Sequence, residues 1–288
     1  MKRLRALSVL LLTAMSVPVA SATGTAVAAP RLVDVRASHH PGFDRVVFEF
    51  EGGLPDSVSA GFVPRLIADG SGLPVRIAGR GILEVSFRST QTDRGTPAPR
   101  RRAFALPNVM TVVRSGLFEG VTTYGIGVAR KGAFQVHKEP EMNRVVVDVH
   151  ATFDTVERRV YFFDVDRFQA NREPFFVSRF RQVPVDNPAT GVMDRLFAGP
   201  LPQERANGLR LLRSHAKDFA DLSIDGQIAR VRLVRGCSSG GSTVTVAGEI
   251  LPSLRQFDTV DWVKILDPDG QTADPLGPGD SIPDCLNP

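Results

Sequence analysis

The sequence predicts two domains, an N-terminal all-β domain and a C-terminal α+β domain. Short β-branched or alternating runs, separated by Gly- and Pro-rich turns, fill the chain from about residue 32 to residue 153. An amphipathic helix follows near residue 190, and strand-like segments flank it on both sides. Roughly 260 residues remain after an N-terminal leader, and this length is enough for two domains of common size.

The first 28 residues have the pattern of a secretory signal peptide. Three basic residues precede an apolar run that begins at Ala6, and small residues follow it. Two A-x-A cleavage signals are present, at 20–22 and 26–28, and we prefer the second, so that the mature chain begins at Ala29. The apolar run is shorter than the ~20 residues that span a bilayer, which disfavours an uncleaved anchor helix.

Composition has to be considered without this leader. The formal net charge of +4 falls to about +1 because the leader carries three basic residues and no acidic residue. A balance this small gives no support to a nucleic-acid partner. No cysteine lies near the cleavage region for lipidation, and no later segment is long and apolar enough to span a membrane. We therefore expect a secreted, extracellular protein without a membrane span.

The all-β domain is expected to cover residues 29–155. Its predicted strands are six short runs, at 46–50, 83–87, 111–113, 127–129, 133–136 and 145–149. Gly-Gly, Gly-Arg-Gly and Pro-rich breaks separate them, and no segment has a convincing helical period. Regular short strands with turn signals favour an antiparallel sandwich or a barrel-like sheet.

A basic stretch in this domain is the first candidate for ligand binding. The segment 94–102, RGTPAPRRR, combines Gly, Pro and four arginines and is expected to form an exposed loop. Arg100, Arg101 and Arg102 could contact the phosphates of anionic wall polymers, because guanidinium groups bind phosphate in a forked geometry. The alternative is a solvated loop without a ligand.

Two aromatic residues form the second candidate. Phe118 and Tyr124 stand among the glycines of the segment 117–128 and could form an exposed surface for a sugar ring. Core packing is the more ordinary role for Phe118, whereas for Tyr124 the two interpretations stay open. Both residues are kept as candidates.

Neighbouring histidines and an aspartate could in principle bind a metal ion. His39 and His40 would point to opposite faces of an extended chain, and with Asp44 they form no recognised ligand motif. Asp44 is expected to be a turn residue ahead of the strand at 46–50. We therefore expect no metal and no cofactor.

Four separated segments of this domain resemble a known family. They are GFDRVVFEFEG (42–52), FVPRLIADGSG (62–72), LFEGVTTYGIGV (117–128) and RVVVDV (144–149). Together they resemble the AMIN-like domain. That family is similar to the AMIN modules that place envelope enzymes and secretion machinery at the bacterial cell wall. The resemblance implies targeting or binding at the wall.

The α+β domain is expected to cover residues 156–288. Its first helix should begin with Asn187 as N-cap and Pro188 in the first turn, and should end at Gly199. A second helix is expected after Ala247, with Pro252 tolerated in its first turn. Strands are predicted at 160–163, 175–180, 222–224, 228–233 and 260–265, with a hairpin turn at 225–226. This order predicts helices packed on one face of a sheet.

Two segments of this domain resemble a second family. They are LFAGPLPQERANGL (196–209) and, far downstream, ILPSLRQFDTVDWVKI (250–265). These segments resemble the GerMN domain, the sporulation and spore-germination module of bacterial envelope proteins. The resemblance implies an α+β fold and an envelope function, and it names no ligand.

The chain contains two cysteines, Cys237 and Cys285. A single pair in an exported chain usually forms a disulfide. The alternative is a free thiol nucleophile, but no histidine stands at a recognisable spacing from either cysteine. We therefore expect a disulfide that ties the Gly/Ser-rich segment 236–242 to the Pro-rich tail.

The function predicted from these observations is binding or scaffolding in the cell envelope, without catalysis. The expected partner is peptidoglycan, an anionic polymer attached to it, or an envelope protein, and the process could be sporulation, division or wall maintenance. A wall-acting hydrolase is one alternative, with Asp164 and Asp166 alternating on one expected strand as paired carboxylates. An extracellular carrier with an apolar pocket between the domains is the other, and no sequence feature favours or excludes it.

Overall fold

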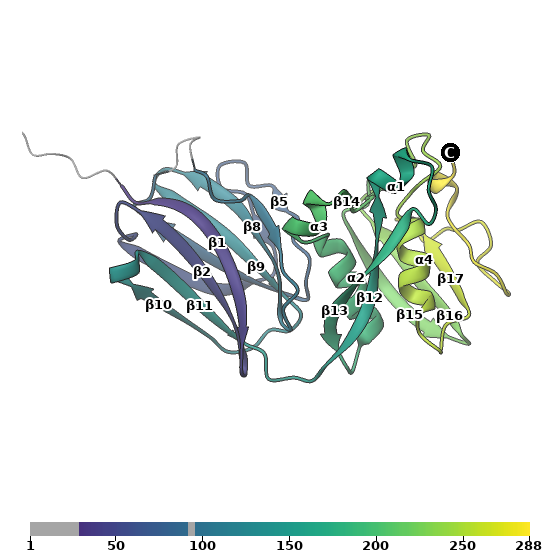
Figure 1. Ribbon diagram of the computed structural model, residues 1–288, viewed down its shortest axis with the longest axis horizontal. Coiled ribbons are helices and arrows are strands. Elements are labelled where there is room, and N and C mark those ends of the chain that lie inside the picture. The colour runs from purple at the N-terminus through teal and green to yellow at the C-terminus, as the bar shows by residue number, and fades with distance from the viewer. Residues whose placement is uncertain (1–28, 92–95) are drawn as a thin grey trace, which may run out of the picture.

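The computed structural model describes residues 29–91 and 96–288. The predicted signal peptide lies outside the described residues, as does Arg94 of the basic stretch. Figure 1 shows an N-terminal part built from strands, coloured purple to teal, beside a C-terminal part coloured green to yellow. Within the described ranges, no helix is long and apolar enough to cross a bilayer.

The N-terminal part is a sandwich of two antiparallel sheets, with strand orders β1-β2-β11-β10 and β3-β6-β9-β8-β7, and the short strands β4 and β5 form a separate ribbon. The bounds are β1 Arg31–His40, β2 Phe43–Glu51, β3 Ser57–Val63, β4 Leu66–Ile67, β5 Pro74–Val75, β6 Gly81–Arg88, β7 Arg101–Ala103, β8 Val109–Phe118, β9 Val121–Val128, β10 Phe134–Glu139 and β11 Arg144–His150. The inner faces pack together, since Phe48 of β2 contacts Phe87 and Tyr124 of the other sheet at centroid distances of 4.8 and 5.6 Å. The predicted antiparallel β architecture is confirmed here.

Glycines in β9 serve close packing and not a turn. A Cβ atom at Gly125 would lie 2.7 Å from a methyl carbon of Leu66, and one at Gly127 would clash with the carbonyl oxygen of Ala78. The segment that contains β4 and β5 therefore approaches the sheet at these two positions. The strand predicted at 127–129 covers only the last residues of β9.

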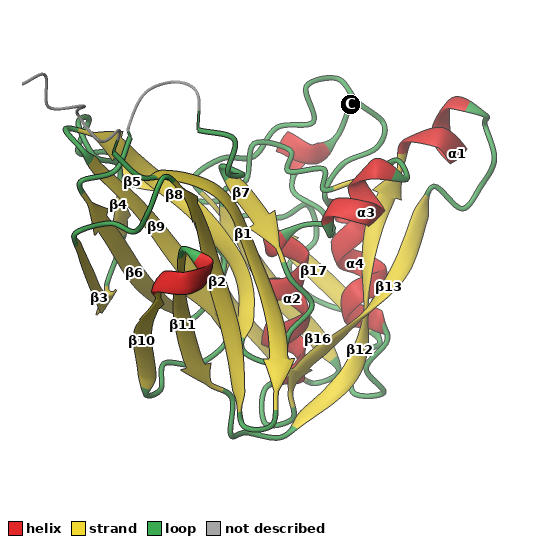
Figure 2. Ribbon diagram, turned by 60° about the vertical axis from the view of Figure 1, so that its left-hand side comes forward, coloured by secondary structure: helices red, strands yellow, loops and turns green. Residues whose placement is uncertain are grey.

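The C-terminal part contains two three-stranded sheets and four α-helices. One sheet has the order β13-β12-β14 and the other β15-β16-β17, in which β16 and β17 run parallel. The strand bounds are β12 Thr155–Asp164, β13 Phe176–Pro184, β14 Leu209–Arg210, β15 Asp218–Asp225, β16 Ile228–Val234 and β17 Trp262–Leu266. The helix bounds are α1 Val165–Gln169, α2 Pro188–Ala198, α3 Pro202–Ala206 and α4 Ala247–Arg255. Figure 2 shows these four helices together on the C-terminal side of the molecule.

The two longer helices lie between the small sheets. Helix α2 contacts β12, β13 and β15, and helix α4 contacts β12 and β17. The expected single sheet with helices on one face is therefore corrected to two sheets that share a helical layer. Helix α2 has the predicted bounds: Asn187 occupies the N-cap position without a side-chain capping bond, and Gly199 ends the helix at φ +91°.

Two local predictions in this part are wrong. Pro252 lies inside α4, beyond its first turn, because the helix begins at Ala247. Asp164 and Asp166 do not share a strand, because β12 ends at Asp164, whose side chain accepts a hydrogen bond from the backbone N–H of Arg167 and caps α1. The carboxylate pair considered for a hydrolase is therefore not formed as predicted.

Helix α4 covers an edge of β12 with polar side chains. Two of its side chains and that of its C-cap residue accept hydrogen bonds from alternate backbone N–H groups of the strand: Glu249 from Phe163, Ser253 from Tyr161 and Gln256 from Arg159. The helical and strand periods match along this line. This arrangement satisfies donors that an open strand edge would leave exposed.

The two parts meet across a contact region that we call the seam. Ala78, Met110 and Ala129 of the N-terminal part belong to the same buried apolar cluster as helix α2. Arg80 binds the carboxylate of Asp194 with two hydrogen bonds, of 3.0 and 2.7 Å. The predicted boundary at residue 155 coincides with the start of β12. The division into independent domains stays a prediction, because the parts share a core at the seam.

Cys237 and Cys285 form a disulfide, as predicted. The bridge joins the loop after β16 to the C-terminal 3-10 turn Asp284–Leu286. The backbone adds a contact beside it, where the N–H of Ser239 donates to the carbonyl oxygen of Cys285 at 2.7 Å. The sequence separation is 48 residues, for which chain entropy predicts a stabilisation of about 4 kcal/mol.

Candidate functional site

Three arginines on the outer face of the β1-β2-β11-β10 sheet are paired with carboxylates. Arg45 binds Asp148 with two hydrogen bonds of 2.7 Å. On the same sheet, Arg36 and Arg144 both bind Glu49, at 2.6 and 3.0 Å. Guanidinium groups that hold a carboxylate have fewer donors left for a ligand. This face is therefore a weaker candidate for anion binding than its arginine content suggests.

The two candidate aromatic residues do not form one surface. Tyr124 is fully buried, and its hydroxyl donates to the carbonyl oxygen of Pro99 at 2.9 Å. Burial raises the pKa of this phenol to about 12. Phe118 is 50% exposed at the end of β8. The predicted sugar-binding role of Tyr124 is therefore wrong in this structure, and Phe118, for which core packing was expected, is the exposed ring.

The three candidate arginines have three different surroundings. Arg101 and Arg102 belong to β7, which pairs with β8, so the expected exposed loop is wrong at this end. Arg100 is exposed. Arg102 binds Asp34 at 2.9 Å and donates to the carbonyl oxygen of Val35, which ties β7 to β1. Arg101 alone lies at the seam.

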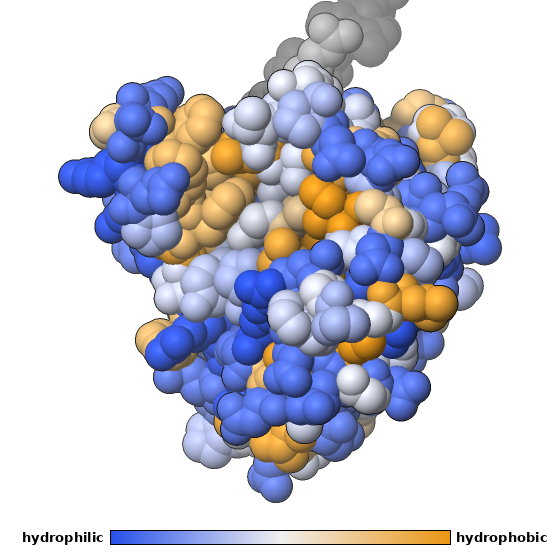
Figure 3. Space-filling model, turned by 90° about the vertical axis from the view of Figure 1, so that its right-hand side faces the viewer, coloured by the Kyte–Doolittle hydropathy of each residue, from blue (hydrophilic) through white to orange (hydrophobic). Residues whose placement is uncertain are grey.

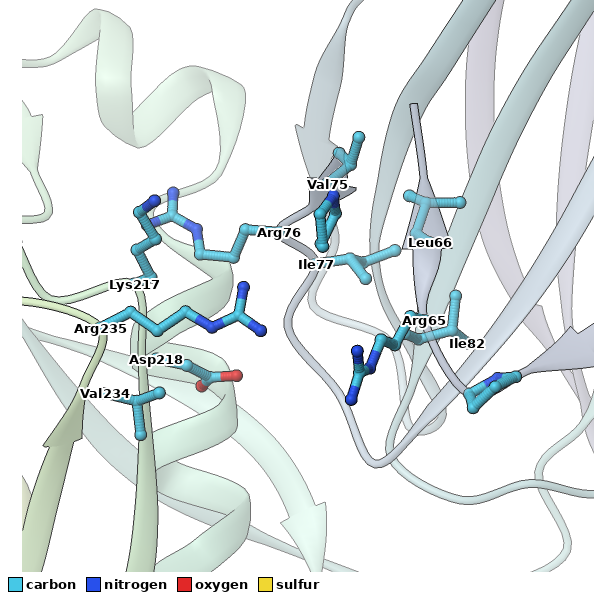
Figure 4. A pocket seen from close by; sticks show the side chains of 12 residues that line it. Arg65, Leu66, Val75, Arg76, Ile77, Ile82, Lys217, Asp218, Val234 and Arg235 are labelled. Carbon is cyan, nitrogen blue, oxygen red and sulfur yellow. The ribbon is translucent and has the colours of Figure 1, made fainter. Parts of the chain in front are cut away.

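One of the cavities at the seam has a volume of about 510 Å³. Residues after β3 and around β4 and β5 form one wall. Residues at the start of β15 and at the end of β16 form the other. Figure 4 shows Arg76 reaching from the sandwich toward Lys217, while Arg235 and Asp218 extend from the opposite side. Arg65 also lines this space, so four basic side chains face one carboxylate. We call it the seam cavity.

A second cavity of about 330 Å³ shares Arg76 with the first. Five arginines and the residues that end α2 line it, and no acidic residue does. The arginines are Arg76, Arg101, Arg205, Arg210 and Arg213. We call this space the arginine pocket. Backbone carbonyl groups hold some of its guanidinium nitrogens, since Arg213 donates to Phe197 at 3.1 Å and Arg101 donates to the carbonyl oxygen of Arg76.

Three arginines of this pocket, Arg76, Arg101 and Arg213, are partly buried, and the positive charges repel one another. Burial, followed by the charges of Arg76 and Arg101, lowers the pKa of Arg213 to about 9. Burial likewise lowers the pKa of Arg101 to about 10. Three nitrogens, Nε of Arg76 and Nη1 of Arg101 and Arg213, are buried without a hydrogen-bond partner among the described residues. The pocket therefore has donors and positive charge that the rest of the described chain does not satisfy.

Two carboxylates act on these arginines from nearby. Glu249 and Asp218 both favour the charged form of Arg213. Glu249 accepts hydrogen bonds from the backbone N–H groups of Phe163 and Leu212, and burial raises its pKa well above the usual value. Burial also raises the pKa of Asp218. Neither carboxylate lines the arginine pocket.

Arg101 is the one arginine of this pocket that was predicted from the sequence as a candidate, and the other four were not predicted. The spacing within RANGLRLLR, residues 205–213, is the one local signal that could have indicated three of them. Arg76 has no such signal, because it joins the others only when the two parts dock. The set is therefore a product of tertiary structure.

Asp44, which was considered with the histidines for a metal site, has a structural role. Asp44 is fully buried in β2, so the expected turn position is wrong. Its carboxylate accepts hydrogen bonds from the backbone N–H groups of Asn108 and Val109, at 2.6 and 2.7 Å, and lies 2.8 Å from Nδ1 of His39. In the described part of the chain, no group of three His, Cys, Asp or Glu side chains is placed to hold a metal ion.

Comparison with known proteins identifies part of the chain. No curated protein and no solved structure matches it. The matched family suggests a role associated with the cell wall or envelope, and the disulfide fits an extracellular location. Residues 30–151, which span the sandwich from β1 to β11, match the AMIN-like domain.

Proposed function

We propose that this chain is a secreted, non-enzymatic protein of the bacterial envelope that binds cell-wall material. The observation that carries the proposal is the AMIN-like domain over the whole sandwich, residues 30–151. Export is proposed from the signal-peptide pattern at 1–28 and is supported by the disulfide. The C-terminal part is proposed to be a GerMN domain on the motifs at 196–209 and 250–265.

The seam supports a binding role in which the two parts act as one body. Arg195 of α2 is buried and donates to the carbonyl oxygens of Leu106 and Pro107 in the sandwich, at 2.6 and 2.8 Å. This contact and the Arg80–Asp194 ion pair fix the C-terminal part against the AMIN-like domain. A polymer held by one part would therefore position the other part as well.

The exposed charge at the seam favours an anionic polymer as the ligand. Arg65, Lys217 and Arg235 are exposed where the seam cavity opens, and Arg205 and Arg210 are exposed at the arginine pocket. Figure 3 views the C-terminal part from the end that faces away from the sandwich and the seam, and there the surface is mostly hydrophilic, with its apolar patches separated by hydrophilic residues. This face favours a polar ligand over an apolar protein surface.

Sedimentation with purified wall tests the proposal. The complete mature chain should sediment with insoluble peptidoglycan that retains its anionic polymers. Binding should fall as salt rises, because exposed charges are screened over a Debye length of about 8 Å at physiological ionic strength. Arg205→Gln with Arg210→Gln should flatten this salt dependence. The control Arg88→Gln, at an exposed residue at the end of β6 away from the seam, should leave it unchanged.

Wall stripped of its anionic polymers separates the two expected ligands. Retained binding would assign peptidoglycan, and lost binding would assign the polymer. Failure to sediment with either wall preparation would reject wall binding and leave an envelope protein as the partner. Release of soluble muropeptides by the pure protein would show that it is a hydrolase and would overturn the non-enzymatic assignment.

A second candidate function is that of a carrier for a small ligand, and the seam cavity is the observation that favours it. Its volume of about 510 Å³ falls within the ~300–1,000 Å³ that is common for ligand sites. Leu66, Val75, Ile77, Ile82 and Val234 supply apolar surface beside the basic residues. An acidic ligand with an apolar portion would suit this lining. Saturable binding of such a molecule, together with no sedimentation with wall, would support the carrier function.

A further inference from the structure

We propose that the arginine pocket binds a phosphate-class oxyanion that carries two or more negative charges. The ligand is a phosphomonoester or diphosphate group, free or at the end of a larger molecule. The inference concerns one site inside the seam and does not depend on wall binding by the rest of the protein.

The wall of the arginine pocket is strongly basic. Five arginines line a space of about 330 Å³, and no acidic side chain lines it. Elsewhere the same chain pairs the buried guanidinium group of Arg181 with the carboxylate of Glu204, and the half-exposed group of Arg80 with Asp194. Buried cations are usually paired, because an isolated buried charge is costly. An unpaired set of this size therefore indicates a partner that binds from outside the chain.

Some guanidinium nitrogens of the pocket have hydrogen-bond partners and others have none in the described chain. Arg101 and Arg213 each use one nitrogen to bond a backbone carbonyl group, while Nη1 of each is buried without a partner in the described chain. Nε of Arg76 is also unsatisfied. The carbonyl contacts hold the guanidinium groups in position before a ligand arrives. Pre-positioned forks lose little conformational entropy when they bind an oxyanion.

The balance between the charges of the arginines and those of the nearby carboxylates favours a phosphate ligand over a simple carboxylate. Five arginines stand against Asp218 and Glu249, whose fields reach Arg213 from outside the pocket. Even with both carboxylates ionised, three positive charges are unbalanced. One carboxylate ligand would neutralise one of them, whereas a phosphomonoester or a diphosphate neutralises about two or more. Tetrahedral oxygens also accept from several forks at once.

Isothermal titration of the complete mature protein with inorganic pyrophosphate tests the site, with inorganic phosphate and a poly(glycerol phosphate) chain as further probes. Pyrophosphate should bind saturably at one site. Arg101→Gln and Arg76→Gln should each weaken binding about tenfold or more, as expected for loss of a charge-assisted hydrogen bond. Arg100→Gln removes the same charge from the neighbouring exposed residue and should change the affinity less than about twofold, because exposed charges are screened.

The probes also separate the sources of the phosphate. Tight binding of pyrophosphate with none of the polymer assigns a terminal phosphate or diphosphate, and equal binding of the polymer assigns an internal phosphodiester and overturns the charge argument. The proposal is wrong if no probe binds saturably at matched ionic strength. It is also wrong if Arg100→Gln weakens binding as much as Arg101→Gln, provided that circular dichroism shows all variants folded.

Discussion

Replacing Asp44 with alanine should lower the free energy of unfolding by about 3 to 5 kcal/mol. The carboxylate is fully buried and accepts hydrogen bonds from the N–H groups of Asn108 and Val109. Alanine would leave both donors buried without an acceptor, and each such loss costs about 1 to 3 kcal/mol. The effect should extend to the seam, because Leu106 and Pro107 just before these donors bind Arg195. Urea denaturation followed by circular dichroism measures the change.

The Asp44→Asn variant separates the acceptor from the charge. The side-chain oxygen of asparagine can take the position of Oδ2, which accepts both backbone bonds, while its amide group faces His39. We therefore expect this variant to lose less than about 1.5 kcal/mol. Asp34→Ala is the matched control, because Asp34 makes a partly exposed ion pair with Arg102, a type worth about 0 to 1 kcal/mol. Equal losses in Asp44→Ala and Asp44→Asn would contradict the acceptor role.

The second large effect is expected at Glu249. This carboxylate is fully buried in α4 and accepts hydrogen bonds from the N–H groups of Phe163 and Leu212. Glu249→Ala should destabilise the protein by about 3 to 5 kcal/mol, because it leaves two buried donors unsatisfied and opens a cavity. Glu249→Gln keeps an acceptor oxygen in place and should retain most of the stability. Ser253→Ala, on the same helix face, removes one acceptor and should cost about 1 to 3 kcal/mol.

The pH dependence of Glu249 has a defined sign. Burial raises its pKa well above the usual 4.5. The native protein therefore keeps a proton that the unfolded chain loses, and the contribution of Glu249 to stability decreases as pH rises above 4.5. Wild type and Glu249→Gln should be close in stability near pH 4, and wild type should fall relative to the variant toward pH 7. A difference that is constant or moves the other way would show that the carboxylate is ionised in the native state.

The elements that were predicted correctly are those with local signals. Pro188 and Gly199 mark the ends of α2, and Asp225-Gly226 marks the β15–β16 hairpin. The disulfide followed from the presence of a single cysteine pair. These features depend on a few neighbouring residues or on elimination. Their physical causes can be identified without knowing what the segment packs against.

The failures are positions where a distant segment decides the outcome. In the sequence Gly125 has the character of a turn residue, but in the structure Leu66 packs against it. In the sequence Tyr124 could be a surface residue, but in the structure the second sheet covers it. Arg101 resembles its neighbour Arg100 in sequence, and only the docking of the C-terminal part places it beside Arg213. The candidate site lies at the seam, and the sequence indicated only a small part of it because the seam is built from both parts of the chain.

Fractionation of the cells that make this protein tests the envelope assignment most directly. Antibody detection should find the protein in the wall fraction, and muramidase digestion of that fraction should release it. The released chain should begin at Ala29, after removal of the signal peptide predicted at 1–28. A protein that stays in the cytoplasm with its first residues intact would contradict both the envelope role suggested by the AMIN-like domain at 30–151 and the proposed export.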